Sequence, residues 1–211
     1  MKSILIVPFA WLCCAATASA QGELRVTGLA SPAVRNSAVG TGIAELSGGG
    51  STVEVLARAR YVGVHVRVFG ADLSDGISFA NGDVRAVLGP QALSAELGIT
   101  RRAVAGPLGT NQLSYIRVGG RSTVPLGSSG LRAMVGVWSL QGSGLPGWVR
   151  SSRGVEGETA LLYQLPRLPI FAQVGYRRER FDVSIFPNGE APEEAGVMNF
   201  GVGLSFGGRN R

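Results

Sequence analysis

The chain has 211 residues, of which 45% are hydrophobic and 32 are glycine, and 20 basic residues against 14 acids give a net charge of +6. This length favours a single domain, and the apolar content excludes a disordered chain. Lys2 is the only lysine, and inward-phase arginines are spread along the chain, nearly one per predicted strand: Arg58, Arg67, Arg85, Arg102, Arg117, Arg132 and Arg177. Proteins that bind nucleic acid usually cluster their basic residues, so we expect no nucleic-acid partner.

The first twenty residues have the order of a cleaved export signal. Lys2 gives a positive start, Ile4 to Ala16 forms an apolar core, and Ala18-Ser19-Ala20 is a small-x-small cleavage site. This core is too short to span a bilayer as a helix, which needs about 20 apolar residues. Both cysteines, Cys13 and Cys14, lie inside the signal. We therefore expect a signal peptide at 1–20 and one exported domain at 21–211 without disulfides.

Ten stretches after the signal are predicted to be β-strands, because apolar side chains recur at every second position. In one of them Leu93, Leu97 and Ile99 share a face, whereas Glu96 and Arg102 lie on the other. The predicted strands are Glu23–Ala30, Ser51–Ala59, Val62–Gly70, Gly82–Leu88, Ala92–Val104, Gln112–Val124, Leu131–Gln141, Val155–Leu165, Ile170–Phe181 and Val197–Phe206.

The number of strands depends on the second and third stretches. The apolar residues from Val53 to Ala59 hold one phase, and those from Val62 to Val68 hold the opposite phase. The change at Arg60-Tyr61 indicates either a two-residue hairpin or a β-bulge within one long strand. We favour the hairpin, which gives ten strands. The bulge, together with a loose N-terminal segment, would give eight.

The connections between these stretches alternate in length, as they do in membrane barrels with short periplasmic turns and long outer loops. The short connections are Arg60-Tyr61, Gly89-Pro90-Gln91, Pro125–Gly130 and Pro166–Pro169. The long loops are predicted at Ser31–Gly50, Ala71–Asn81, Ala105–Asn111, Gly142–Gly154 and Asp182–Gly196.

The length of the apolar face along each strand distinguishes a membrane barrel from a soluble sandwich. Each face extends over about nine to ten residues, a length that crosses a bilayer at a tilt, whereas strands in globular proteins are usually about five or six residues long. Inside the hydrocarbon of a bilayer the sheet must also close into a ring, since an unpaired strand edge would leave backbone polar groups without hydrogen-bond partners. The sequence thus predicts an all-β fold, a closed antiparallel up-and-down transmembrane β-barrel of about ten strands. The expected lipid-facing residues are Leu93, Leu97, Ile99, Val174, Phe200, Val202, Leu204 and Phe206.

The last predicted strand carries a resemblance to a known class. Together with the export signal and the repeated amphipathic stretches, the run Met198-Asn199-Phe200-Gly201-Val202-Gly203-Leu204-Ser205-Phe206 resembles the small outer-membrane β-barrel proteins of bacteria over the whole exported chain. The resemblance implies a place in the outer membrane, contact with its lipid and lipopolysaccharide, and recognition of the final strand by the barrel assembly machinery. In that class the strand commonly ends in an aromatic residue. Phe206 fits this pattern, although Gly207 to Arg211 follow it.

Charged residues on the faces opposite the apolar ones are the main functional candidates. Inside a narrow barrel they could line an anion channel, or they could fill the lumen as ion pairs between neighbouring strands. We favour the ion pairs, because arginine binds carboxylates with two parallel hydrogen bonds and an unpaired buried charge is costly. The candidates are Glu54, Arg58, Arg67, Asp83, Arg85, Glu96, Arg102, Arg117, Arg121, Arg132, Glu156, Glu158, Arg177 and Glu179.

Three further features carry weaker signals. His65 is the only histidine, and one histidine cannot define a metal site, so we expect no metal and no cofactor. Trp148 and Arg153 fall in a predicted loop and could form an aromatic and basic surface for lipopolysaccharide phosphates, or anchor the barrel at the membrane interface. The acidic stretch Glu190–Glu194 is expected to be a solvated loop.

These observations leave several functional hypotheses. The first is a non-enzymatic outer-membrane barrel with a structural or surface-interaction role. The second is a narrow arginine-lined channel for small anions. The third is a lipid-modifying enzyme that uses His65, for which the sequence offers no convincing set of catalytic residues. A soluble secreted β-protein, with the apolar faces turned inward, is the rival outside the membrane.

Overall fold

The computed structural model describes residues 22–38, 46–107, 109–142, 149–185 and 189–207. The predicted signal peptide lies outside these residues. Within the described residues, no helix is long and apolar enough to span a membrane. A short 3₁₀ turn, η1 (Ser74–Gly76), accompanies the strands. The strands are β1 (Gly22–Ala38), β2 (Leu46–Ala59), β3 (Val62–Leu73), β4 (Ser78–Leu88), β5 (Leu93–Gly106), β6 (Gly109–Pro125), β7 (Leu131–Gly142), β8 (Val149–Gln164), β9 (Ile170–Ile185) and β10 (Gly189–Gly207).

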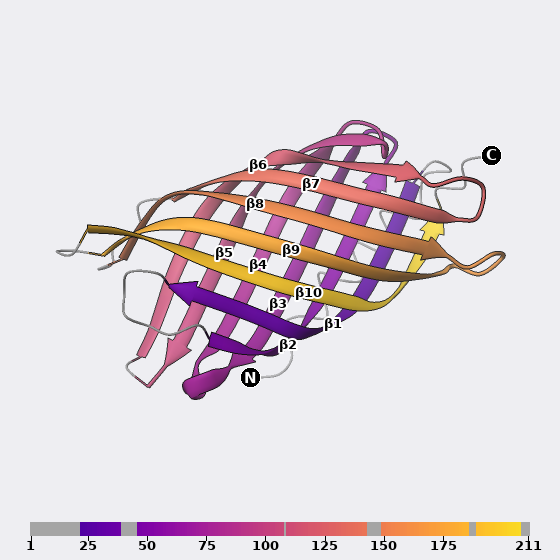
Figure 1. Cartoon of the computed structure of the whole chain (residues 1–211). Helices are drawn as coiled ribbons and strands as arrows, with labels where there is room; N and C mark the ends of the chain where they lie inside the picture. The colour runs from indigo at the N-terminus through magenta and orange to yellow at the C-terminus, as the bar shows by residue number, and fades with distance from the viewer. Residues whose placement is uncertain (1–21, 39–45, 108, 143–148, 186–188, 208–211) are drawn as a thin grey trace, which may run out of the picture.

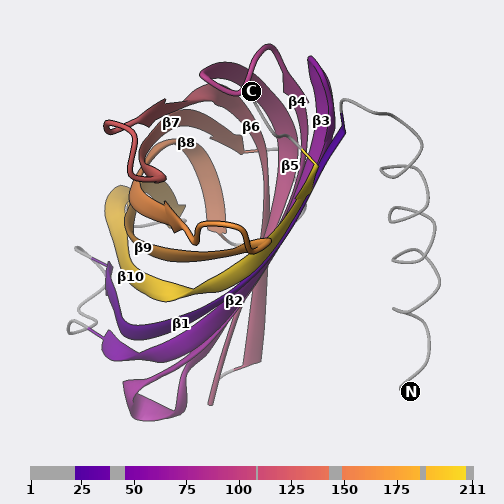
Figure 2. The same ribbon diagram turned by 90° about the vertical axis from the view of Figure 1, so that its right-hand side faces the viewer.

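The ten strands form one closed barrel in which each strand pairs antiparallel with its neighbours in sequence (Figure 1). The first and last strands close the ring, with Leu24 opposite Phe206 at one end of the seam and Asn36 opposite Ala195 near the other. Viewed along its axis, the sheet surrounds a central space (Figure 2). Closure leaves no unpaired edge, so the predicted up-and-down barrel of ten strands is confirmed.

The two-residue hairpin at Arg60-Tyr61 is also confirmed and explains why the count is ten. β2 ends at Ala59, β3 begins at Val62, and the two residues pair with each other. Arg60 lies at φ 45°, as the tight hairpin turns that match strand twist require. The Gly89 N–H donates to the Tyr61 carbonyl at 2.8 Å, which ties this turn to the next one at the same end.

The barrel has two distinct ends. We call the end where β1 begins and β10 ends the terminal end, and the opposite one the distal end. Tight turns lie at the terminal end, to the right in Figure 1. The Leu126 N–H donates to the Leu131 carbonyl at 2.8 Å, and the Leu165 N–H to the Ile170 carbonyl at 2.9 Å. These turns agree with the short connections expected from the sequence.

The prediction of long distal loops was wrong in extent. Much of the chain assigned to Ser31–Gly50 is strand, because β1 continues to Ala38 and β2 already begins at Leu46. The residues assigned to Asp182–Gly196 mostly belong to β9 and β10. In these extensions the outward apolar alternation stops while backbone pairing continues. Some of their apolar residues, such as Leu73 and Phe79, instead turn inward. The other three loops are also shorter than predicted. β3 ends at Leu73 and β4 begins at Ser78; β5 ends at Gly106 and β6 begins at Gly109; β7 ends at Gly142 and β8 begins at Val149.

The outer surface of the barrel carries an apolar belt. Large hydrophobic side chains on β2 to β10 are at least 38% exposed, and where a strand has several they occupy alternate positions. The outward positions of β1 carry smaller exposed residues, such as Gly28 and Ala30. On β10 the belt extends from Met198 to Phe206. At about 3.4 Å per residue and a tilt of 35–45°, this length corresponds to a height of about 20–25 Å. Apolar side chains therefore face outward, against the soluble alternative in which they would meet in a central core.

Candidate functional site: an ion-pair network inside the barrel

The strand alternation places the fourteen charged candidates on inward-facing positions. Arg85, Arg102 and Arg117 are fully buried, with 0% of their side chains exposed. The expected lipid-facing residues, from Leu93 to Phe206, are all at least 43% exposed on the opposite face. The interior is therefore charged and the exterior apolar, with each strand contributing to both.

Asp83 on β4 is the centre of the network. Its carboxylate accepts from Arg67 Nε at 2.8 Å, from Arg85 Nε at 2.6 Å and from Arg117 at 3.3 Å. The sheet register explains two of these contacts, because Arg67 on β3 lies directly opposite Asp83 and Arg85 is the next inward residue on the same strand. Arg117 reaches in from β6. One carboxylate therefore joins three strands.

Glu156 and Glu158 on β8 complete the pairing across the lumen. Glu156 accepts from Arg67 at 3.2 Å and pairs with Arg117. Glu158 lies 3.6 Å from Arg67 and 3.7 Å from Arg121. Because β8 is far from β3 and β4 in the strand order, these pairs run through the barrel and not along its wall. Four acids (Asp83, Glu96, Glu156 and Glu158) face four arginines (Arg67, Arg85, Arg117 and Arg121).

Trp138 on β7 fills the space beside the ion pairs. Its indole N–H donates to Glu96 at 3.1 Å, and it is 0% exposed. Gly119 lies opposite both residues, since it pairs with Glu96 on β5 and with Trp138 on β7. A Cβ atom at Gly119 would come within 2.7 Å of the Trp138 ring and 2.1 Å of a backbone oxygen. The glycine therefore leaves the room through which the indole reaches the carboxylate.

The same indole ring is bordered by three arginines. Arg117, Arg85 and Arg121 place their guanidinium carbons 4.8, 5.2 and 5.6 Å from the ring centroid. Cations attract the electron-rich face of tryptophan, and the attraction strengthens where water is excluded. Trp138 thus supports the guanidinium groups that the acids neutralise. Trp138 was not among the lumen residues predicted from the sequence, although its even-numbered phase on β7 matches that of the inward Arg132.

A second, aromatic layer lies distal to the ion pairs. The Arg102 guanidinium sits between two rings, 4.4 Å from the Phe79 centroid and 5.0 Å from that of Phe181, and pairs with Glu193. Phe181 in turn stacks on Tyr115 at 4.8 Å. These rings were missed as lumen residues. Their phase could have revealed them, since Tyr115 lies two positions from Arg117, and Phe181 two positions from Glu179.

An apolar cluster fills the distal part of the lumen. Phe69 and Phe79 meet edge to face at 5.6 Å, and Leu73 packs beside them. The cavity next to this cluster has a volume of only ≈ 10 Å³, about the minimum for one water molecule. At this end the lumen is therefore apolar and closely packed. The cluster consists of Val34, Leu46, Phe69, Ala71, Leu73, Phe79 and Val197.

The other candidates lie around this framework. Arg58 is buried at the terminal end and donates to the Gly89 carbonyl. Arg177 pairs with Glu179 on β9 at 3.5 Å. Arg132 and Glu54 occupy half-buried inward positions, and neither makes an ion pair with the residues that the structure describes. The structure therefore brings eight of the candidates into one central network and places the other six around it.

His65 belongs to the network too. It is 2% exposed and accepts from Arg121 through Nδ1 at 3.4 Å. Arginine can only donate, so this bond requires an Nδ1 atom without a proton. Among the described residues, no three His, Cys, Asp or Glu side chains gather as a metal site would require. The geometry gives His65 a packing and hydrogen-bonding position beside the ion pairs.

The weaker surface candidates had different outcomes. Trp148 lies outside the described residues. Arg153 is exposed on β8. The interpretation of Glu190–Glu194 as a solvated loop was wrong, because this segment belongs to β10. There the strand alternation turns Glu193 inward to Arg102 and Glu194 outward to Arg178.

Comparisons with known proteins give little beyond the fold. No model of a protein family matches the chain, and no curated protein matches its sequence. Among solved structures, the chain is similar to the crystal structure of Neisserial surface protein A (NspA), with 16% identity and a TM-score of 0.46. The alignment covers 87% of this chain and 97% of that one. At this similarity neither a family nor a function follows.

We predict that removing a central acid destabilises the barrel strongly. Glu156→Ala or Glu96→Ala would leave buried arginines without their partner, at a cost of about 3–5 kcal/mol. Urea unfolding of the barrel in lipid vesicles, followed by the shift in gel migration between folded and unfolded forms, measures this. Asp75→Asn in the exposed turn η1 is the matched control. Equal unfolding midpoints for all three variants would rule out a stabilising network.

We also predict that Gly119 cannot carry a side chain. Gly119→Val would push Trp138 away from Glu96 and overpack the lumen, at a cost of about 1–3 kcal/mol. Gly157→Val on β8 is the control, since a Cβ atom there has nothing within 4 Å. Trp138 fluorescence should shift only in the first variant. A Gly119→Val protein as stable as the control would contradict the packing described above.

Proposed function

We propose that this protein is an integral barrel of the bacterial outer membrane with a closed lumen and a structural or surface-interaction role. The observation that carries the proposal is the combination of the exposed apolar belt with a lumen filled by mutually paired charges. A water-soluble protein rarely exposes more than about 300–600 Å² of contiguous apolar surface. A belt that runs across nine of the ten strands is far larger, and a bilayer is the environment that would cover it.

Closure of the sheet supports the same environment. In hydrocarbon every backbone N–H and C=O group must be paired within the protein, which only helices and closed barrels achieve. The ladder from β1 through β10 and back to β1 meets this condition. The estimated belt height of about 20–25 Å also agrees with the apolar band of outer-membrane barrels, which is about 25 Å tall.

The orientation of the barrel in the membrane follows from the difference between its two ends. An even number of strands puts both ends of the barrel domain on one side, and the short turns lie there as well, as they do on the periplasmic side of such barrels. The distal end then faces outward. On β9 the apolar belt stops at Tyr176, and the strand continues for nine residues to Ile185. Strands that project beyond the membrane suit a role in surface contacts.

The final strand fits recognition by the assembly machinery. Phe206 lies near the terminal end of β10, with its ring turned outward and 48% exposed. Its neighbours on the same face are Leu204 and Val202. We therefore keep the barrel assembly machinery as an expected partner, and a cleaved signal at 1–20 as the expected export route.

The lumen favours a closed barrel over the anion channel. An anion would have to displace carboxylates from arginines that are already paired, such as Arg67 and Arg117, which are 1% and 0% exposed. It would then have to pass the apolar cluster around Phe69 and Phe79. The lipid-modifying enzyme gains no support either, because His65 is buried from the bilayer by the barrel wall and bonded to Arg121.

The membrane location has a direct test. Leu97, on β5, is 54% exposed in the belt, so Leu97→Arg would place a charge against lipid at a cost of about 2–4 kcal/mol near the bilayer centre. Folding into vesicles should fail or weaken accordingly. Arg at Thr110, an exposed site near the distal end of β6, should fold normally. Extraction of the wild-type protein by salt without detergent would refute the membrane assignment.

The closed lumen is tested by single-channel recording. We expect no stable conductance steps from the folded protein in planar bilayers, because paired charges and aromatic side chains occupy the cross-section. Steps of constant size that disappear in Arg102→Ala or Arg117→Ala would show that an arginine-lined channel exists, contrary to the proposal. A known porin in the same bilayers provides the positive control.

A further inference from the structure

The inward side chains are more accessible at the terminal end of the barrel than at the distal end. Arg25 and Arg121 keep 13% and 11% of their side-chain surface exposed, and Arg132 is half-buried. Towards the distal end Arg102 is 0% exposed, and the apolar cluster around Phe69 leaves almost no space. Water and small solutes can therefore enter the lumen from the terminal end, but the described residues leave them no passage through it.

The charges of the lumen are balanced in its depth but not at this accessible end. Every inward arginine of the central network and of the distal layer has an acid within ion-pair distance. At the terminal end three arginines accompany one acid, which gives a net charge of 3 − 1 = +2: Arg25, Arg58, Arg132 and Glu23. Glu54 lies two inward positions deeper on β2 than Arg58.

Two of the terminal arginines have no acidic partner among the residues that the structure describes. Glu23 pairs with Arg25 at 2.7 Å. Arg58 is 7% exposed and donates to the Gly89 carbonyl, while its Nε has no partner. Arg132 makes neither an ion pair nor a hydrogen bond within the described part of the chain. Because a guanidinium group carries five N–H donors, both arginines retain donors for a ligand.

Arg58 and Arg132 belong to opposite walls of the lumen. β2 and β7 are five strands apart in either direction around the ring of ten. Arg58 is the second-last residue of β2 and Arg132 the second residue of β7, so both lie one residue inside the terminal end, which faces the viewer in Figure 2. With about 4.8 Å between strands and a tilt of 35–45°, ten strands enclose a ring about 20 Å wide. Two inward arginine side chains span most of this width and leave room for one small anion between them.

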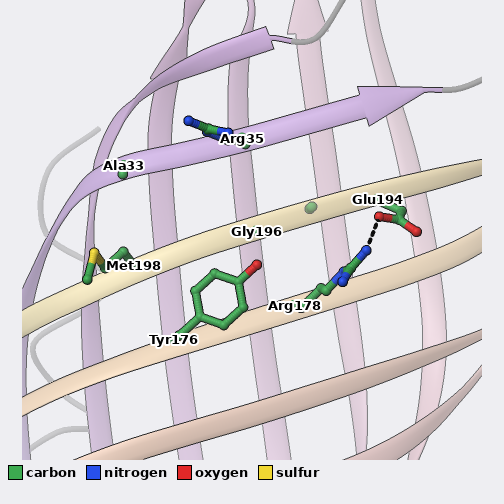
Figure 3. Close-up of a pocket in the computed structure, with 8 residues that line it drawn as sticks. Ala33, Arg35, Tyr176, Arg178, Glu194, Gly196 and Met198 are labelled. Atoms are coloured by element: carbon green, nitrogen blue, oxygen red, sulfur yellow. Dashed lines mark hydrogen bonds and ion pairs between the residues drawn. The ribbon is translucent and has the colours of Figure 1, made fainter.

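The arginines on the outer surface of β9 offer no comparable site, because they already have an acid. Arg178 donates to Glu194 at 2.5 Å, a contact drawn in Figure 3. Arg180 lies 3.9 Å from the other oxygen of the same carboxylate. Both arginine side chains are more than 60% exposed, so water screens their charge. The terminal end of the lumen thus combines unpaired arginines with an enclosed position.

We propose that the terminal end of the lumen binds a small oxyanion, with a phosphate or carboxylate group held between Arg58 and Arg132. The planar fork of arginine matches the oxygen geometry of both groups. The ligand is small because both side chains lie inside the ring of strands. It enters and leaves by the same end, which distinguishes this blind site from a channel. In the proposed membrane orientation that end opens to the periplasm, and only this last statement rests on the proposed function.

The test measures binding of inorganic phosphate and of citrate to the folded barrel in a neutral detergent by isothermal titration calorimetry. Sodium chloride keeps the ionic strength constant, so that general screening does not differ between samples. We expect the wild type to bind at least one of the two anions, and the tighter one identifies the favoured group. Arg132→Gln should raise the dissociation constant at least about tenfold, because it removes charge-assisted hydrogen bonds. Its urea midpoint should match that of the wild type, since Arg132 has no partner in the protein to lose.

A second variant tests the opposite wall. Arg58→Gln should also weaken binding at least about tenfold, for the same reason. Each variant has a matched control with the same charge change at a nearby terminal turn: Arg167→Gln for Arg132 and Arg60→Gln for Arg58. Arg60 and Arg167 are exposed outside the lumen, so both controls should bind like the wild type. Heat-modifiable migration of each variant shows that it has folded.

The outcomes separate this inference from the membrane proposal. If the wild type binds neither anion, or if Arg132→Gln binds as tightly as Arg167→Gln, the site does not exist. Conductance steps carried by phosphate or citrate across a planar bilayer would overturn the blind site in favour of a channel. Failure of the wild type to insert into vesicles would overturn the proposed function and the periplasmic location, whereas calorimetry in detergent tests the site by itself.

Discussion

The mutual neutralisation of charges inside the barrel is the constraint on which the rest of the structure depends. Strand alternation forces each residue either into lipid or into the lumen, so a charged side chain on a membrane-spanning strand must point inward. Once there, it is far from bulk water and needs a partner. Asp83 accepts from three arginines on three strands, and Glu156 reaches two of the same arginines from β8. These contacts cross the lumen and join opposite walls, whereas backbone pairing joins only neighbouring strands.

Side chains have to fill the lumen as well as balance its charges, and glycine residues on adjacent strands make this packing possible. Gly119 leaves room for Trp138 to reach Glu96, and Gly98 similarly leaves room for Arg85, whose side chain would lie 2.7 Å from an added Cβ atom. Large side chains therefore lie across small ones on the adjacent strand, as layers do in other narrow barrels. The high glycine content is thus explained in part by the size of the arginines and the indole.

The sequence predicted the orientation of side chains better than their partners. Period-two alternation assigns Leu97 to the outside and Glu96 to the inside with no knowledge of the fold. It cannot tell that Glu96 meets Trp138 across Gly119, because that contact depends on the register of β5, β6 and β7. The distal strand extensions were missed for a related reason. Residues such as Gly48, Gly49 and Gly50 pair with β3 through their backbones alone, so their side chains carry no pattern.

The two glutamates at 193 and 194 show how one short segment serves both sides of the barrel wall. As a sequence, Glu190–Glu194 has the acidity and the proline of a solvated loop. In β10 the alternation sends Glu193 to Arg102 inside and Glu194 to Arg178 outside. The first neutralises an arginine held between Phe79 and Phe181, and the second pairs with an exposed arginine on the outer surface of β9. Because successive side chains on a strand point to opposite faces, a shift of β10 by one residue would turn Glu193 outward and leave Arg102 without its partner. The ion pair inside the lumen therefore ties the register of β10 to the closed interior.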